Sequence, residues 1–383
     1  MCKCSVYVNS DWSELVSKDT EVSKYRQVLD AVRNEIVSGK YAVDRRLPTR
    51  SEIGERFGVG MATVQKALEA LTRDGFLTAR PGAGTYLVEN APHESCFGLL
   101  LPHESYSASV IHDNAVRQAA KEVDNGASIQ FKYYGISALV QYRQDVNRLC
   151  DDVVCHRLAG LISPFHHGEL DNTPVMTTPG VPRVLCGDMK REGQFCVGPE
   201  GGSFQKRALE YVLSRVRRRI AHLQMETETS TGTLALESEL REMGLDARPY
   251  WIQRVNAGHT ASPATNTIRL LMELEGDKRP DALIVHDDNL LDAVVAGLLS
   301  CDVRVPDELE VVSLANFPTP RPQGIQVRRL GFDWVELISR SIDVIRRAHQ
   351  GHKSPPMFLP AVFEDELPNR RATGQNGFAA AMR

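Results

Sequence analysis

The stretch that decides the fold of the first part of the chain is Leu47-Pro48-Thr49-Arg50-Ser51-Glu52-Ile53, which is followed by Gly58-Val59-Gly60. Thr49 is a residue type that caps a helix N-terminus, and Glu52 stands three residues later, as a capping box requires. The glycines around Val59 indicate a short turn. A third helix with a regular apolar face follows over residues 62–74.

Working outward, the chain predicts another helix before this pair and a hairpin after it. Apolar residues recur at three- and four-residue steps from Tyr25 to Val37, and Gly39 ends this first helix. Two short strands, 76–80 and 85–88, flank a glycine-rich turn. Three helices and a hairpin, with a tight turn between the second and third helices, predict a winged helix-turn-helix.

This region resembles the GntR family over roughly residues 23–90. The segments that carry the resemblance are 36–40, 46–53, 59–68, 71–77 and 80–86. The resemblance implies a domain that binds operator DNA through its third helix. The family usually has Ser-Arg where this chain has Gly60-Met61, and losing a cation there favours weaker binding and a shallower dependence on salt.

The polar face of the third helix supplies the first candidates for DNA contact, because the N-terminal residues of a recognition helix lie near base edges. Gln65 suits adenine, and Lys66 suits guanine or a phosphate. A solvated polar face is the alternative interpretation. The candidate DNA-binding residues are Arg46, Thr49, Arg50, Thr63, Gln65, Lys66, Arg80, Gly82 and Gly84.

From Cys96 onward, short apolar runs alternate with helical patterns. The runs are 97–102, 158–162, 181–185, 219–223, 282–285 and 309–314; the helical patterns are 111–123, 201–214, 233–243, 265–275, 290–299 and 334–348. Strands that alternate with helices predict parallel sheets covered by helices. The predicted fold class is therefore a small α+β winged helix followed by an α/β domain with parallel sheets.

This second part resembles the effector domain of LacI-type regulators, which is similar to periplasmic sugar-binding proteins, over about residues 95–365. Segments 218–221, 280–288 and 305–314 carry the resemblance. It implies two lobes and a small-molecule effector. Relatives commonly place an arginine after the central strand, but residues 227–236 contain none, so a sugar is only the first candidate for the effector.

Ligands in such folds bind beyond the carboxyl ends of the strands. Side chains that follow the predicted strands are therefore the candidates, with Trp334 as a face on which a sugar ring stacks; a plain loop role is the alternative for each. The candidate effector-binding residues are His103, Ser105, Tyr106, Phe165, His166, Asp287, Asp288, Asn316 and Trp334.

Composition and the lengths of the apolar runs indicate in which compartment the protein acts and whether it binds a membrane or a metal. The net charge is -4, no apolar run reaches the roughly 18 residues of a membrane span, and no apolar segment follows the N-terminus as in a signal peptide. We expect a cytoplasmic protein that binds no membrane and whose eight cysteines are free thiols. Cys2-Lys3-Cys4 and residues 150–156 lack the paired spacing of a zinc site, so no metal or cofactor is expected.

Three other classes of protein are alternatives to a ligand-controlled regulator. A pyridoxal-phosphate enzyme domain needs a Schiff-base lysine, but after Lys206 only Lys278 and Lys353 remain. The strand-rich pattern argues against an all-helical metal-binding partner domain. A ligand-binding module whose DNA domain has lost its function stays open because of Gly60-Met61. We therefore expect a regulator, a repressor by preference, and not an enzyme.

The expected domains are a flexible arm (1–20), a GntR-type winged helix (21–90), a LacI-type effector domain (95–367) and a disordered tail (368–383). The expected partners are double-stranded operator DNA, a small-molecule effector for which a carbohydrate is the first candidate, and a second copy in a homodimer.

Overall fold

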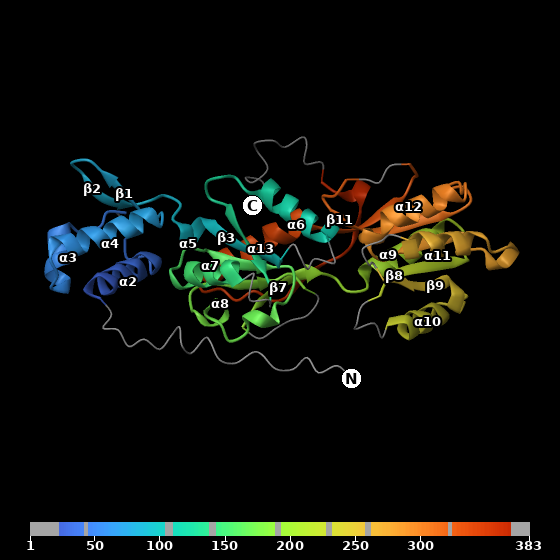
Figure 1. The fold of residues 1–383 in the computed structure, drawn as a ribbon, viewed down its shortest axis with the longest axis horizontal. Coiled ribbons are helices and arrows are strands. Elements are labelled where there is room, and N and C mark those ends of the chain that lie inside the picture. Colours follow the sequence, from blue (N-terminus) through green and yellow to red (C-terminus); the bar gives the residue numbers. More distant parts are fainter. Residues whose placement is uncertain are drawn as a thin grey trace. The chain divides into compact units, whose positions relative to one another are not determined.

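The computed structural model describes residues 23–41, 45–103, 110–137, 143–187, 193–226, 232–256, 262–320 and 324–368. The chain divides into two compact units: Met1–Ser95 with Val154–Arg157, and Cys96–Val153 with Leu158–Arg383. Figure 1 labels their elements. Within the described ranges, no helix is both long and apolar enough to cross a membrane.

The first unit is a winged helix-turn-helix. Its elements are α2 (Lys24–Val37), α3 (Arg50–Phe57), α4 (Met61–Arg73), β1 (Leu77–Arg80), β2 (Gly84–Leu87) and α5 (Pro92–Ser95), and β1 pairs antiparallel with β2. The capping box forms as predicted: the Thr49 hydroxyl accepts from the Glu52 amide, and the Glu52 carboxylate accepts from the Thr49 amide at 2.7 Å. Gly58, with a φ of 61°, ends α3 in the left-handed conformation and makes the predicted turn.

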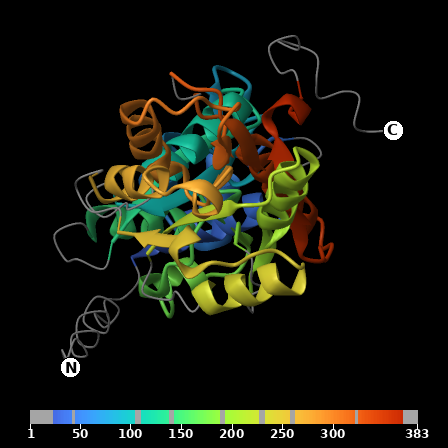
Figure 2. The same ribbon diagram turned by 90° about the vertical axis from the view of Figure 1, so that its right-hand side faces the viewer.

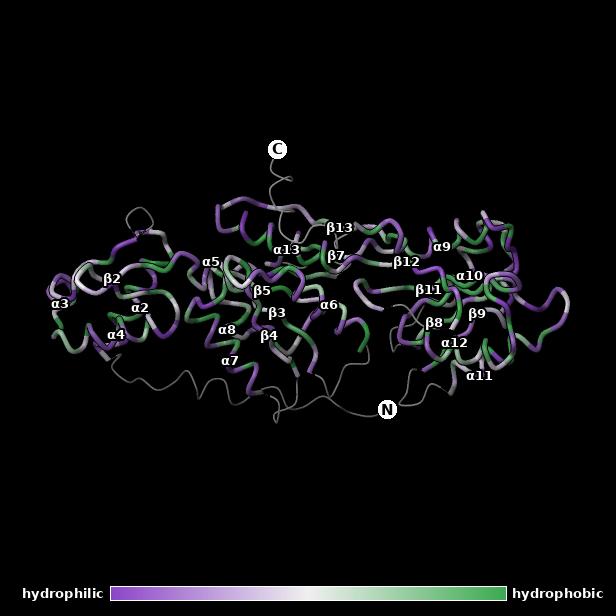
Figure 3. The backbone as a smooth tube through the Cα atoms, turned by 90° about the horizontal axis from the view of Figure 1, so that it is seen from above, coloured by the Kyte–Doolittle hydropathy of each residue, from purple (hydrophilic) through white to green (hydrophobic). Residues whose placement is uncertain are grey.

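One apolar core holds these helices together. The inward face of α4, with Val64, Ala67, Leu68 and Leu71, packs on Val28, Val32 and Ile36 of α2 and on Phe76 before the hairpin. The spacing of these residues is the one that predicted the helices. Figure 3 shows hydrophobic and hydrophilic stretches alternating along the helices, as expected where one face is buried.

The first sheet of the second unit has the strand order β13-β7-β6-β5-β3-β4, with all neighbours parallel. Its strands are β3 (Cys96–Pro102), β4 (Gln130–Ile136), β5 (Gly160–Ser163), β6 (Arg183–Leu185), β7 (Phe195–Pro199) and β13 (Met357–Leu359). Helices α6 (Val110–Val123) and α13 (Trp334–His349) share one core with it, and α7 (Arg143–Val154) and α8 (Pro174–Thr177) share another.

The second sheet has the order β14-β12-β11-β10-β8-β9 and is parallel except for β14. Its strands are β8 (Ile220–Met225), β9 (Ile252–Val255), β10 (Ala282–Val285), β11 (Glu310–Phe317), β12 (Arg328–Asp333) and β14 (Val362–Phe363). Helices α11 (Ser262–Met272) and α12 (Leu291–Ser300) share one core, and α9 (Ser203–Ser214) and α10 (Gly232–Glu242) the other. Figure 2 shows α10 in yellow and α12 in orange on opposite sides of this sheet.

The predicted fold class is confirmed, because a winged helix is followed in sequence by two mainly parallel sheets that are covered by helices. Every predicted apolar run contributes to a strand. The strands β4, β7, β9, β12, β13 and β14 and the helices α5, α7 and α8 were not predicted. The chain also passes between the sheets more than once, since α13 follows β12 of the second sheet yet packs in the core of the first.

Candidate DNA-binding and effector-binding sites

The recognition helix α4 presents its buried face to α2 and its other face to solvent. Met61, Ala62, Lys66 and Glu69 are exposed, and Thr63 and Gln65 are partly so. Gly60 caps the helix without a side-chain hydrogen bond, and its first turn carries no acidic residue. The helix end that would meet the base edges is therefore neutral, with Met61 54% exposed.

Gln65 of α4 is hydrogen-bonded both to the neighbouring helix α3 and to its own helix. Its amide oxygen accepts from Arg50 Nη1 of α3 at 2.6 Å, and its amide nitrogen donates to Glu69 Oε1 at 2.7 Å. Both polar ends of Gln65 therefore have partners, and Arg50 is fixed beside the recognition helix. Lys66 lies over the Tyr25 ring, 4.9 Å from its centroid.

The hairpin brings further candidates together. Arg80 lies 4.5 Å from the centroid of the Tyr86 ring. Gly82 and Gly84 have φ values of 73° and 116°, which L side chains rarely adopt, so the turn depends on them. A Cβ on Gly84 would lie 3.3 Å from Arg46 Nε, which places the Arg46 guanidinium against the hairpin. Thr49 caps α3 rather than standing free.

In the second unit, a cavity of about 520 Å³ lies at the carboxyl ends of strands from both sheets. This cavity, called the cleft cavity below, takes residues that follow β5, β6, β7 and β10, and others at the ends of β11 and β12. Of the candidates, it brings together Phe165, Asp287, Asp288, Asn316 and Trp334. Its volume lies within the range of about 300–1,000 Å³ typical of small-molecule sites.

A hydrogen-bonded chain fixes three of these candidates. Asp288 Oδ2 accepts from the amide and from the side-chain nitrogen of Asn316, both at 3.0 Å, and the Trp334 indole donates to Asn316 Oδ1 at 3.0 Å. All three are buried, with Trp334 only 3% exposed. Burial raises the pKa of Asp288, while its bonds to Asn316 act in the opposite direction.

Asp287 is the neighbouring carboxylate on the cavity wall. Its Oδ1 accepts from the amide of Asn289 at 2.9 Å and from the Asn289 side chain at 2.8 Å. Asn289 Oδ1 in turn accepts from the amide of Ile111 in α6 at 3.3 Å. Burial also raises the pKa of Asp287. The residues that follow β10 therefore connect to the first helix of the other sheet.

Aromatic rings line the same cavity. His112 of α6 lies 4.8 Å from the Phe165 ring and 4.6 Å from the Trp334 ring, edge-on to the latter. A flat apolar face beside hydrogen-bonding groups is the arrangement that receives a sugar ring or a similar polar molecule. Trp334 contributes to this face from a largely buried position.

A fully buried histidine, His222, pairs with the partly buried His286 at the cavity wall. His222 Nδ1 and His286 Nε2 lie 3.0 Å apart, and His286 lines the cavity. Burial lowers the pKa of His286 to about 4 and, together with the charge of His286, lowers the pKa of His222 well below its usual range. Both rings are therefore neutral at physiological pH, so one ring donates and the other accepts.

The structure places the other candidates elsewhere. His103 follows β3, where its amide donates to the Ile136 carbonyl at 2.9 Å, and it does not line the cleft cavity. His166 lines a separate small cavity beside Asp171. Ser105 and Tyr106 lie outside the described residues, as do residues 227–231 of the stretch without arginine.

Several cavity residues were missed by the sequence reasoning. His112 and Gln205 stand in the first turns of helices, Glu200 follows the unpredicted strand β7, and His286 precedes Asp287. No cluster of metal-ligating side chains occurs in the residues that the structure describes.

Comparison with known proteins gives two family matches. The model described as "Bacterial regulatory proteins, gntR family" matches residues 24–87. The model described as "Periplasmic binding protein-like domain" matches residues 209–342. Both agree with the resemblances found in the sequence.

Similar curated proteins are regulators. The arabinose metabolism transcriptional repressor of Geobacillus stearothermophilus is 21% identical over 323 residues, which cover 78% of this chain and 84% of that protein. The mannosyl-D-glycerate transport/metabolism system repressor MngR of Escherichia coli (strain K12) is 36% identical over 75 residues, covering 20% of this chain and 31% of its own.

Solved structures support the fold. A regulatory protein of the LacI family from Chloroflexus aggregans superposes with a TM-score of 0.54 at 17% identity, covering 70% of this chain and 96% of that one. A LacI family regulator from Lactobacillus casei with bound glucose gives 0.52 at 16% identity, covering 70% and 98%. The chain thus combines a gntR-type DNA-binding domain with a LacI-type, periplasmic-binding-protein-like domain that follows it in sequence, which is the domain composition of a transcriptional regulator rather than of an enzyme.

Proposed function

We propose that this regulator is a repressor of carbohydrate-metabolism genes and that a sugar-like effector in the cleft cavity controls its binding to operator DNA. The observation that carries the proposal is the cleft cavity itself. Its buried Asp288–Asn316–Trp334 chain and the neighbouring Asp287 offer acceptors for hydroxyl groups beside an aromatic face. The relative named for arabinose metabolism, whose match covers 78% of this chain, supports the same class of effector.

The proposed mechanism is a shift in population. An effector that contacts residues of both sheets favours the arrangement in which those residues come together. In a homodimer, that arrangement would change the spacing of two winged helices, and half-sites about one helical turn apart would fit only one state. In that state, the candidate DNA-binding residues of both winged helices would contact the operator at the same time.

The test uses the full chain and a labelled duplex from its own upstream region, followed by fluorescence anisotropy at several salt concentrations. We expect binding that weakens as salt rises, since phosphate contacts release counterions, but less steeply than in relatives that keep Ser-Arg at the positions of Gly60-Met61. A panel that includes L-arabinose, D-glucose and their derivatives should contain a sugar that changes operator affinity. Asp287→Asn should lose that response while binding DNA as the wild type does.

The outcomes separate the proposal from its rival. A protein that binds a sugar but no DNA at low salt would instead be a ligand-binding module, the alternative that the uncapped, uncharged start of α4 favours. A protein that binds its operator with no response to any sugar would overturn the carbohydrate assignment.

A further inference from the structure

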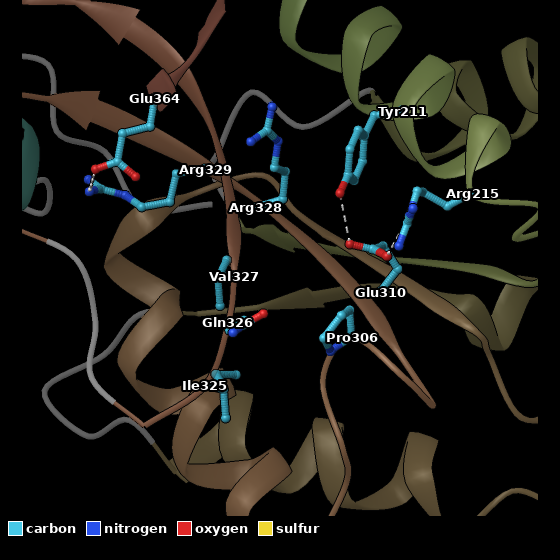
Figure 4. A pocket seen from close by; sticks show the side chains of 10 residues that line it. All are labelled: Tyr211, Arg215, Pro306, Glu310, Ile325, Gln326, Val327, Arg328, Arg329 and Glu364. Atoms are coloured by element: carbon cyan, nitrogen blue, oxygen red, sulfur yellow. Dashed lines mark hydrogen bonds and ion pairs between the residues drawn. The ribbon is translucent and has the colours of Figure 1, made fainter. Parts of the chain in front are cut away.

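A second cavity lies in the same unit, at the amino ends of β11 and β12. Its volume is about 550 Å³, and Tyr211, Arg215, Glu310, Arg328, Arg329 and Glu364 contribute to its wall (Figure 4). Glu310 is the first residue of β11 and Asn316 stands near its end, so this cavity and the cleft cavity lie at opposite ends of the same strand. The proposed carbohydrate site leaves this cavity unassigned.

The central group of this second cavity is the Glu310 carboxylate, whose side chain is only 5% exposed. Its Oε1 accepts from the Tyr211 hydroxyl at 3.1 Å. Its Oε2 accepts no hydrogen bond from any described residue, although Arg215 Nε lies 3.5 Å away. Figure 4 shows Tyr211 and Arg215 both pointing to Glu310. Burying a carboxylate lowers stability unless its oxygens are hydrogen-bonded. Glu310 Oε2 is therefore available to accept a hydrogen bond from a ligand.

The other arginines of the wall are already neutralised. Arg328 binds Asp365 through both terminal nitrogens, at 3.1 and 2.9 Å, and its guanidinium lies over the Phe363 and Tyr211 rings. Arg329 donates to Glu364 at 3.0 Å and to Thr319 at 2.8 Å. These pairs fix the wall without requiring a ligand.

Arg215 differs from them. Its side chain is 56% exposed at the end of α9, and its ion pair with Glu310 is long. An exposed arginine in a loose pair is free to change partners at little cost. The cavity therefore places a buried acceptor anion beside an adaptable cation, with the Tyr211 ring on the same wall.

We propose that this second cavity binds a small zwitterion of the amino-acid class. The ammonium group donates to Glu310 Oε2, and the carboxylate pairs with Arg215, which turns from Glu310 to meet it. The methylene groups between the two charges lie against the Tyr211 ring. Two charge-assisted hydrogen-bond partners of opposite sign, one buried and one exposed, select for both ends of the ligand at once.

Isothermal titration of the full chain tests this assignment with glycine, β-alanine, 4-aminobutyrate and 5-aminovalerate. One member should bind, because the series spans the separations that two such partners can set. Butylamine and butyrate, which each carry one charge, should bind about ten-fold more weakly or worse. Equal binding of either single-charge probe, or no binding in the whole series, would overturn the proposal.

Variants of the full chain locate the site. Glu310→Gln keeps the shape and the bond from Tyr211 but removes the charge, and it should weaken binding about ten-fold or more. Arg215→Ala should reduce the zwitterion to the affinity of butylamine. Asp307→Asn, an exposed carboxylate in the preceding loop, is the matched control and should bind as the wild type does. Wild-type affinity in a folded Glu310→Gln protein would refute the site.

Discussion

Met61 is the residue at which this winged helix departs most clearly from the GntR pattern. Within residues 23–41 and 45–95, it is the one exposed large apolar side chain. It opens α4, and Gly60, Ala62 and Thr63 around it carry no charge. At the end of a recognition helix, an apolar side chain suits the 5-methyl group of thymine, whereas an arginine suits guanine.

We therefore predict that Met61 contacts a thymine in each half-site. Replacing that thymine with deoxyuridine removes one methyl group and should weaken wild-type binding by about four-fold, the value of roughly 0.8 kcal/mol for one buried carbon. Met61→Ala should bind both duplexes equally. Anisotropy titrations of each protein with each duplex measure how far the effect of the thymine methyl group depends on Met61.

Met61→Arg is the informative control, since it should shift the preferred base at that position to guanine. If no thymine in the operator is sensitive to loss of its methyl group, or if Met61→Ala stays equally sensitive, Met61 does not read this group.

The His222–His286 pair leads to a prediction about pH. An unfolded histidine titrates near 6.5, whereas burial lowers the pKa of folded His286 to about 4 and lowers the pKa of folded His222 well below its usual range. Below pH 6.5 the unfolded chain binds protons that the folded pair does not. The stability that the pair contributes is therefore present above pH 6.5 and is lost as the pH falls toward 4.

His286→Gln should flatten this dependence of unfolding free energy on pH between 6.5 and 4.5. Asp287 and Asp288 have raised pKa values and act in the opposite direction, so the comparison between the variant and the wild type is the readout. Chemical denaturation at several pH values gives both curves. Parallel curves would show that His286 does not titrate as described.

At the scale of elements, the strands of the second unit that were predicted from sequence are mostly buried on both faces. Residues 282–285 of β10 are all buried, so their composition alone identifies a strand. β9 and β4 lie at sheet edges, and their sequences mix apolar residues with Gln, Arg and Lys. The segment of β12 begins with two arginines whose carboxylate partners come from residues 364 and 365. These ion pairs form only in the folded chain, so the local sequence pattern does not show that a segment with two charged residues is a strand.

The same limit applies to the cleft cavity. Asp288, Asn316 and Trp334 follow recognisable strands or begin a helix, so their positions were predictable and the structure joins them directly. His112 and Gln205 come from helices whose first turns reach the cavity only because of how the sheets pack. His103 and His166 also follow strands, yet they lie elsewhere, because a position after a strand does not determine which way a loop turns.

The α3 capping box gives a prediction at this scale. Thr49→Ala removes the acceptor for the Glu52 amide and should cost about 1 kcal/mol of stability. In a unit of this size, that corresponds to a melting temperature lower by about 4–8 °C. Ser51→Ala, two residues further along the same helix, is the control and should change little. Calorimetry measures both, and equal melting temperatures for Thr49→Ala and wild type would contradict the capping role.

At the scale of the whole molecule, each unit has a core of its own. Among the residues that the structure describes, the core of the first unit runs from Val28 to Ala91 and includes none from Cys96 onward, and the cores on the two sheets contain none of the winged helix. Units with separate cores unfold as separate cooperative transitions when few interactions join them. We therefore predict two transitions in calorimetry of the full chain.

Paired variants assign the two transitions. Thr49→Ala should lower only the smaller transition. Gly331→Ala should lower only the larger, because a Cβ on Gly331 would lie 1.8 Å from the Ala315 carbonyl oxygen in the neighbouring strand and the backbone must shift. A sugar that binds the cleft cavity should raise only the larger transition, by mass action on the folded state. If either variant moves both transitions equally, or if the wild type unfolds in one step, the units are energetically coupled. The effector signal would then reach the winged helix through shared stability rather than through a change in spacing.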